Sequence, residues 1–159
     1  MRRLISKDLV ESTKSELYDI FDAYKQRGIM PCIADVLFDK NDAATSYVRS
    51  KQKAALSLGV EVRLVDLSNC DGIDAARAAI ETLNADESIH GIVVELPAPK
   101  GWRETDLLDA IEPKKDVDGL SNRSLGSLIS AGAEAGVVAP ATPEACIALA
   151  ELVINLAGV

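Results

Sequence analysis

Short apolar segments alternate with longer amphipathic segments along this chain of 159 residues, and no other feature constrains its fold as strongly. The apolar segments have the length of strands, whereas the segments between them carry apolar residues at helical spacing. Apolar strands separated by helices are typical of a mostly parallel sheet that is covered on both faces. The sequence therefore predicts an α/β fold, a three-layer α-β-α domain in which ligands bind at the C-terminal ends of the strands.

The limits of these elements follow from residues that begin or end regular structure. We expect strands at 31–38, 60–67 and 91–96, and helices at 6–28, 42–58, 74–85, 105–111 and 143–156. Gly28 and Gly59 are expected to end the first two helices. Thr142 should cap the last helix, with Pro143 in its first turn. Residues 121–138 are rich in Gly, Ser and Ala, which favours an irregular connection.

The composition fits one globular domain and argues against several classes of protein. Acidic residues outnumber basic ones 25 to 17, and the net charge of -8 disfavours sequence-independent binding of nucleic acid. The three cysteines form no C-x-x-C pair, so we expect neither a redox pair nor a metal site, and a reducing cytoplasm is the simplest location. Residues 1–8 lack the apolar core of a signal peptide, and the longest apolar stretch, 145–159, is too short to cross a bilayer.

Tyr47 and Lys51 stand four residues apart in a predicted helix, so their side chains should project from the same face. The phenol ring can stack on an aromatic substrate, and the amine can act as an acid, a base or an electrostatic clamp. On spacing alone, a surface helix with a half-buried tyrosine and a solvated lysine is the commoner explanation.

Glu95 is the one ionised group in the apolar strand at 91–96, and it lies close to Pro97. Because proline cannot extend a central ladder, the strand should end here. A carboxylate at this place either faces solvent or lines a site, and the sequence alone favours neither. The single histidine, His90, has no partners for a metal cluster or a catalytic triad, so we predict a structural role for it.

The segment Asp116-Val117-Asp118-Gly119 places two carboxylates next to a glycine. A calcium loop of the EF-hand type requires a third oxygen ligand before the glycine and a later glutamate, and both are missing. Taken alone, the segment is typical of a turn in which the glycine supplies a positive φ and an aspartate bonds to the local backbone.

Three segments, in their order and spacing, resemble the catalytic domain of the methylenetetrahydrofolate dehydrogenase/cyclohydrolase family. They are 41–51, 90–99 and 111–120, with a weaker fourth match at 140–143. The resemblance implies an enzyme of one-carbon metabolism that oxidises 5,10-methylenetetrahydrofolate to the methenyl form with NADP. It also implies hydrolysis of the methenyl form to 10-formyltetrahydrofolate, a product used in purine biosynthesis.

The resemblance further implies roles for individual residues. Lys51 is the expected central catalytic residue, and Tyr47 stacks on the folate. Asp118 binds the pterin, whose two neighbouring N–H donors match two carboxylate oxygens, while Asp116 shapes the loop. Glu95 stands where the family has a glutamine that assists the lysine, and we count it with Lys51 and Tyr47 as catalytic. The expected substrate contacts are Tyr47, Lys51, Val94, Glu95, Leu96 and Asp118.

Two departures from the family pattern affect these expectations. A carboxylate beside a lysine favours the ammonium form, so Glu95 should raise the pKa of Lys51 and make it a poorer general base at neutral pH. We therefore expect weakened or altered cyclohydrolase chemistry. Residues 37–40 replace a usual Val-Gly pair, which should change the loop before the helix but leave the helix itself intact.

Residues 1–157 are expected to form the folate-binding catalytic domain. The family's NAD(P)-binding Rossmann domain is absent from this sequence, which contains no G-x-G-x-x-G, so NADP would be bound by a domain elsewhere in a homodimeric full-length enzyme. The segment 157–159 reads like the start of a further strand, which favours a fragment over a naturally short relative. Two alternatives stay open: a non-catalytic folate-binding or interaction module derived from the family, and an α/β domain of unrelated function.

Overall fold

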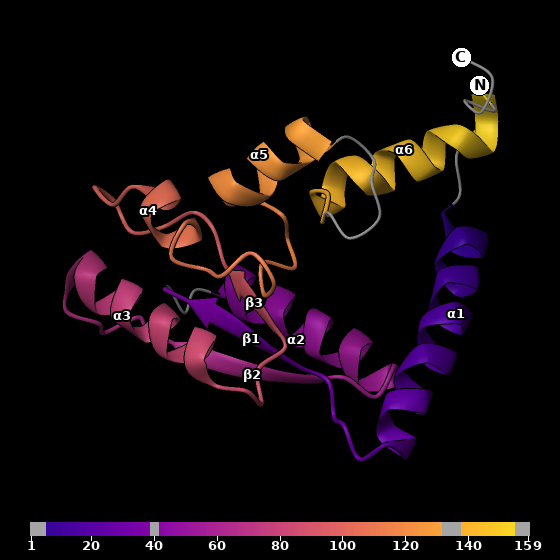
Figure 1. Cartoon of the computed structure of the whole chain (residues 1–159), viewed down its shortest axis with the longest axis horizontal. Helices are drawn as coiled ribbons and strands as arrows, with labels where there is room; N and C mark the ends of the chain where they lie inside the picture. The colour runs from indigo at the N-terminus through magenta and orange to yellow at the C-terminus, as the bar shows by residue number, and fades with distance from the viewer. Residues whose placement is uncertain (1–5, 39–41, 132–137, 155–159) are drawn as a thin grey trace.

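A computed structural model describes residues 6–38, 42–131 and 138–154 of the chain, and strands and helices alternate up to β3 (Figure 1). In chain order the elements are α1 (Lys7–Gln26), β1 (Cys32–Leu37), α2 (Asp42–Ser57), β2 (Glu61–Asp66), α3 (Gly72–Ala85), β3 (Gly91–Val94), α4 (Glu104–Leu108), α5 (Asn122–Ala131) and α6 (Ala141–Ile154). The strands of the described residues form a three-stranded parallel sheet in the order β2-β1-β3. The predicted α/β fold with a parallel sheet is therefore confirmed.

Successive residues of the central strand β1 serve opposite faces of the sheet, because side chains alternate along a strand. Ala34 and Val36 are buried in the hydrophobic core together with Ile80 of α3 and Leu107 of α4. Asp35, between them in sequence, projects from the other face, which α2 covers. Figure 1 shows α2 and α3 on opposite sides of the sheet, as the predicted three-layer arrangement requires.

The prediction of an irregular connection at 121–138 is wrong over its first half, because α5 is a helix. The hydroxyl of Ser121 accepts a hydrogen bond from the backbone N–H of Ser124 at 3.1 Å, which satisfies a donor in the first turn. Serine close to glycine suggested a loop, whereas here the serine caps a helix. The positions 132–137 lie outside the described residues.

Most of the other predicted limits hold within one or two residues. Gly28 and Gly59 follow α1 and α2 with φ angles of 77° and 75°, as expected for glycines that end helices. The predicted cap at Thr142 is wrong, because α6 already begins at Ala141 and Thr142 lies in its first turn. β3 ends at Val94, before the predicted end at residue 96.

The segment that departs from the family pattern lies at the end of β1. Phe38 is buried and its ring meets Trp102 edge to face, with the centroids 5.5 Å apart. Residues 39–41 lie outside the described residues, and α2 is present where the sequence predicts it.

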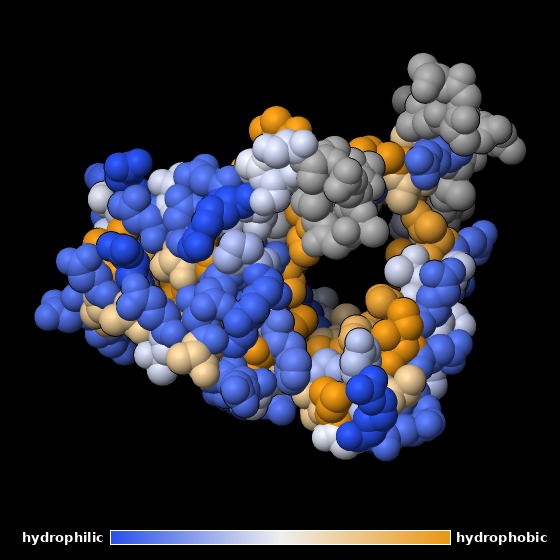
Figure 2. Space-filling view, viewed as in Figure 1, coloured by the Kyte–Doolittle hydropathy of each residue, from blue (hydrophilic) through white to orange (hydrophobic). Residues whose placement is uncertain are grey.

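α1 and α6 stand at one end of the molecule, away from the sheet (Figure 1). None of the described residues of α1 is buried, and Ile20 and Tyr24 of α1 and Ile147 of α6 are exposed. On the face seen in Figure 2, hydrophobic side chains gather around the hollow between this end and the rest of the molecule. Within the described ranges, no helix is long and apolar enough to span a membrane.

Candidate functional site

A pocket of about 200 Å³ lies at the C-terminal end of β3, where a parallel α/β sheet is expected to bind its ligand. Its lining residues are Tyr47, Lys51, Val93, Val94, Glu95, Leu96, Asp118 and Leu120. All the residues that we predicted to contact the substrate are among them. Segments that are far apart in the sequence thus meet around one cavity.

The strand ladder fixes the direction of the Glu95 side chain. Val94 pairs with Val36 of β1, and the backbone N–H of Glu95 donates to the carbonyl oxygen of Val36 at 2.9 Å, one residue beyond β3. Because side chains alternate, Glu95 projects from the same face as Asp35. Shortly after Glu95, the Leu96-Pro97 peptide bond is cis, and here the chain leaves the sheet.

Helix α2 carries Tyr47 and Lys51 to that same face. Val48 is buried and lies on the side of α2 that packs against the rest of the domain. Lys51 follows three residues later, so it lies on the same side of the helix. The Nζ atom of Lys51 lies 5.1 Å from the centroid of the Tyr47 ring. The ring itself is 60% exposed, so a ligand can reach it.

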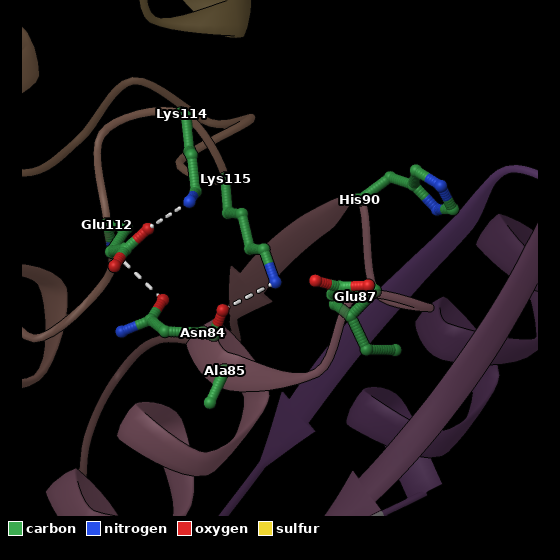
Figure 3. A pocket seen from close by; sticks show the side chains of 8 residues that line it. Asn84, Ala85, Glu87, His90, Glu112, Lys114 and Lys115 are labelled. Atoms are coloured by element: carbon green, nitrogen blue, oxygen red, sulfur yellow. Dashed lines mark hydrogen bonds and ion pairs between the residues drawn. The ribbon is translucent and has the colours of Figure 1, made fainter.

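The loop that carries Asp118 is anchored by Lys115, which is buried. Its ammonium group donates hydrogen bonds to the carbonyl oxygens of Leu83, Asn84 and Asp86 at 3.0, 2.7 and 2.8 Å, at the C-terminal end of α3. Figure 3 shows the side chain turned toward Asn84, beside a second pocket that shares none of the predicted site residues. The lysine of this segment therefore fastens the loop to a helix end, where a cation also complements the helix dipole.

The first aspartate of the loop, Asp116, is fully buried. Its carboxylate accepts hydrogen bonds from the backbone N–H of Ser121 at 3.0 Å and from the hydroxyl of Ser124 at 2.6 Å. Burial works to raise the pKa of Asp116, but these hydrogen bonds outweigh it and the pKa lies below its usual value. The geometry agrees with the expectation that Asp116 shapes the loop.

Two glycines allow the loop to approach the sheet closely around Asp118. A Cβ atom on Gly91 would lie 2.6 Å from Cγ1 of Val117, so β3 must be bare at this position. Gly119 has a φ of 64°, and a Cβ atom on it would lie 2.8 Å from the carbonyl oxygen of Val138. The half-buried Asp118 is held between these two contacts, on the wall of the pocket.

At the pocket, Lys51 is held by two carboxylates. Its Nζ atom lies 2.9 Å from Oδ2 of Asp35 and donates a hydrogen bond to Oε1 of Glu95. Burial works to lower the pKa of Lys51, but the hydrogen bond to Glu95 and the close carboxylates of Glu95 and Asp35 outweigh it, and the pKa is raised. The lysine is therefore an ammonium group at neutral pH, as the presence of Glu95 predicts.

Two aspartates at the pocket, Asp35 and Asp118, have a pKa above the usual value for the residue. Burial raises the pKa of Asp35 to about 6, with Lys51 opposing the shift and Glu95 adding to it. Burial likewise raises the pKa of Asp118, against the charge of Lys51 and with the help of Asp116 and Glu95. One ammonium group thus faces three carboxyl groups.

Three residues at the site were not predicted from the sequence: Val93 and Leu120 of the pocket lining, and Asp35. Asp35 is the single acidic residue in the otherwise apolar segment 31–38, which is the same signal that singled out Glu95 in its strand. Because the structure places the two acids on one face of the sheet and next to Lys51, Asp35 belongs to the site.

His90 lies outside the pocket that contains Lys51 and lines the second pocket instead (Figure 3). Its Nδ1 atom accepts a hydrogen bond from the backbone N–H of Cys32 at 3.2 Å, which ties the start of β3 to β1. This contact supports the predicted structural role. In the part of the chain that the structure describes, no group of three or more His, Cys, Asp or Glu side chains is arranged to hold a metal ion.

Comparison with known proteins gives related folds and sequences. The chain is 39% identical over 153 residues to the bifunctional protein FolD of Heliobacterium modesticaldum, which covers 96% of this chain and 52% of that protein. It is 36% identical over 144 residues to the bifunctional protein FolD 2 of Desulfitobacterium hafniense, covering 91% of this chain and 50% of that one. The chain thus spans about half the length of the curated relatives it matches.

Two solved structures show the same arrangement. The bifunctional FolD enzyme of Campylobacter jejuni superposes with a TM-score of 0.86 at 33% identity, over 94% of this chain and 52% of that one. The methylenetetrahydrofolate dehydrogenase-cyclohydrolase of Trypanosoma brucei, solved with NADP and an inhibitor, gives a TM-score of 0.81 at 28% identity, over 100% of this chain and 54% of that one. Residues 4–118 match the family model described as the catalytic domain of tetrahydrofolate dehydrogenase/cyclohydrolase. The chain therefore belongs to the tetrahydrofolate dehydrogenase/cyclohydrolase family, whose catalytic domain these residues represent.

Proposed function

We propose that residues 1–157 form the folate-binding catalytic domain of a bifunctional enzyme of one-carbon metabolism. We propose that the pocket of this domain hydrolyses 5,10-methenyltetrahydrofolate to 10-formyltetrahydrofolate. The observation that carries the proposal is the ammonium group of Lys51, held against Asp35 and Glu95 in a pocket that also contains Tyr47 and Asp118. The FolD enzymes that the chain resembles are methylenetetrahydrofolate dehydrogenases and cyclohydrolases.

Two side chains suit the recognition of a reduced folate. The exposed ring of Tyr47 offers a flat surface on which an aromatic ring of the substrate can stack. Asp118 offers two carboxylate oxygens to the two neighbouring N–H groups of a 2-amino-4-oxo pterin, and these are strong, paired hydrogen bonds when the carboxylate is charged. Val94 and Leu96 contribute apolar surface to the lining of the same pocket.

The reaction needs a proton donor next to the carbon that reacts. Water adds to the methenyl carbon, the bond from this carbon to N5 breaks, and N5 takes up a proton. One proton is released overall, because the methenyl cation becomes a neutral formyl amide. Lys51, charged and fixed, can donate to N5 and stabilise the oxygen that develops negative charge, while Glu95 tunes its acidity.

For the dehydrogenase activity we propose NADP as the hydride acceptor, bound by a domain outside these residues. The Trypanosoma brucei relative was solved with NADP. The residues of this chain do not suit a dinucleotide, because the sequence contains no G-x-G-x-x-G and Asp71 and Asp74 lie at the N-terminus of α3, where they would repel a pyrophosphate. We therefore derive no hydride-transfer step from them. A homodimeric full-length enzyme in the cytoplasm, serving purine biosynthesis without a metal, remains part of the proposal.

A non-catalytic folate-binding module is the second candidate, and the excess of carboxyl groups around Lys51 favours it. Such a module would bind a folate through Tyr47 and Asp118 without turning it over. Turnover separates the two candidates. An α/β domain of unrelated function would bind no folate at all.

The deciding experiment follows the loss of methenyltetrahydrofolate absorbance with the 159-residue chain and its Lys51→Met variant. We expect Lys51→Met to reduce the rate above background by about 10²- to 10⁴-fold, the usual contribution of a positioned proton donor. Lys53→Met is the matched control, because Lys53 is exposed on the same helix, and it should keep the activity. Equal rates for the wild type and Lys51→Met would contradict catalysis by Lys51. Folate binding without turnover would support the non-catalytic module.

A further inference from the structure

Asp35 occupies an unusual place for a charged residue. It lies in the middle of the central strand, paired with Leu64 of β2 on one side and Val93 of β3 on the other, and it is 1% exposed. An acid in such a position costs stability unless a partner compensates its charge. An apolar side chain of similar size would fill this place without that cost.

The contact between Asp35 and Lys51 is electrostatic more than it is a directed hydrogen bond. Oδ2 and Nζ are 2.9 Å apart, yet neither oxygen of Asp35 has a hydrogen bond of good geometry among the described residues. The well-directed hydrogen bond of Lys51 goes to Glu95. Asp35 therefore acts on Lys51 mainly through its charge, from the side of the sheet.

The two acids that hold Lys51 differ in rigidity. Asp35 is fixed by strand pairing on both sides, whereas Glu95 follows the last residue of β3, borders the pocket and is 15% exposed in its side chain. Lys51 itself has a long side chain, 27% exposed, whose position depends on what holds its end. The only rigid partner of the ammonium group within the described site is thus Asp35.

We propose that Asp35 is a positioning residue, which anchors the ammonium group of Lys51 from the sheet and keeps it charged beside the pocket. Glu95 is then free to respond to a ligand without releasing the lysine. In the proposed reaction this makes Lys51 a fixed cation and proton donor, and not a neutral base. Only this last step rests on the proposed function, because the anchoring itself concerns groups of this chain alone.

The groups that face Asp35 and Lys51 come from several elements. Asp35 faces Lys51 from α2 and Glu95, which follows β3, and Lys51 also faces Asp118 from the loop after α4. Lys51 is the one basic residue among those that line the pocket. Asp35 is also the group whose pKa is raised to about 6, first by burial. The anchor should therefore weaken as the pH falls through this value.

The anchoring can be measured without any assay of activity. The chain is labelled with acetic anhydride over a range of pH, and the extent of labelling of Lys51 relative to Lys53 is read by peptide mass spectrometry. In the wild type, we expect Lys51 to titrate above the usual range of a lysine, because carboxylates stabilise its ammonium form. A wild-type Lys51 that titrates within or below that range would overturn the proposal without recourse to any variant.

Asp35→Asn, a change of charge at nearly constant size, should increase the labelling of Lys51 several-fold at a fixed pH. Asp74→Asn is the control, because it removes the same charge from an exposed position on α3 and should leave Lys51 unchanged. If Asp35→Asn does not fold, as judged by circular dichroism, Asp35→Val provides a second variant of similar volume. A folded variant with an unaltered titration of Lys51 would contradict the anchoring role.

Kinetics give an independent readout for the reaction. Asp35→Asn should lower kcat for the lysine-dependent hydrolysis and leave KM nearly unchanged, because the lost contact orients the lysine and does not touch the substrate. A rise in KM at constant kcat would place Asp35 in substrate binding instead, against the proposal. If the wild type shows no hydrolysis while Lys51 titrates as expected, the proposed function fails and the anchoring stands.

Discussion

Lys115 and Lys51 each hold an ammonium group among several acceptors, and the acceptors differ between the two regions. Lys115 is surrounded by neutral acceptors, the three backbone carbonyl groups at the end of α3. Lys51 is surrounded by carboxyl groups, with Asp35 and Glu95 in contact and Asp118 on the same pocket wall. The same side chain therefore serves as a fastener in one region and as part of a reactive cluster in the other.

The difference lies in what the partners can do with a proton. A backbone carbonyl group does not titrate at any physiological pH, so the three N–H donors of Lys115 stay in hydrogen bonds whose acceptors cannot take up a proton. A carboxylate can take up a proton, and burial brings the pKa of Asp35 to about 6, where its state depends on the conditions. A lysine held by titratable partners can exchange protons, whereas a lysine held by carbonyl groups only stabilises the fold.

The largest effect on stability is expected from Lys115→Met. The change leaves three carbonyl groups of a helix end without their charged donor, and we expect a loss of about 2–4 kcal/mol in the free energy of unfolding. Lys114→Met is the matched control, because Lys114 is 71% exposed and its ion pair with Glu112 lies at the surface, so its removal should cost less than about 1 kcal/mol. Urea unfolding at neutral pH gives both values. Equal losses would show that Lys115 is no anchor.

The two aspartates of the same loop should separate stability from binding. Asp118→Asn is expected to weaken the binding of a folate analogue about 10- to 100-fold, because a charged acceptor contributes about 1.5–3 kcal/mol, with little loss of stability. Asp116→Asn should lower the free energy of unfolding by about 1–3 kcal/mol, since its buried carboxylate holds Ser121 and Ser124. Calorimetric titration and thermal unfolding of both variants test the pair. Intact binding by folded Asp118→Asn would remove Asp118 from the folate site.

The sequence predicted the elements whose patterns are local. Strand and helix alternation gave the parallel sheet, and the glycines after α1 and α2 lie where the sequence placed them. α5 was not predicted, because its start depends on contacts of Ser121 and Ser124 with Asp116, and a propensity for loops does not register such contacts. Propensity is a weak guide wherever tertiary contacts decide.

The site was predictable in part for a similar reason. Residues brought together by known motif segments, such as Tyr47, Lys51 and Asp118, line one pocket, although their roles stay predictions. Asp35 could not be assigned, because its meaning depends on the pairing of β1 with β3, which puts it on the face of Glu95. Similarly, only the three-dimensional contacts show that Lys115 binds the C-terminal end of α3 and does not join Lys51 in the candidate site.

Glu95→Gln should have the smallest effect, a displacement of the pH profile with a change of less than about tenfold in the maximal rate.

In the wild type, Asp35 takes up a proton as the pH falls through about 6, which weakens its hold on Lys51 and lowers the lysine-dependent rate. Burial of Asp35 persists in the variant, but the neighbouring carboxylate of Glu95 no longer raises the pKa of Asp35, so the acid limb moves to lower pH. Lys51 loses one of the two carboxylates that raise its pKa, so the alkaline limb moves to lower pH as well. The rates of Glu95→Gln, measured from about pH 5 to 9 over the Lys51→Met background, cover the acid limb, which should thus move to lower pH. Glu81→Gln, an exposed change on α3, is the control. An unmoved profile would mean that Glu95 does not tune the lysine, and that Asp35 alone distinguishes this ammonium group from that of Lys115.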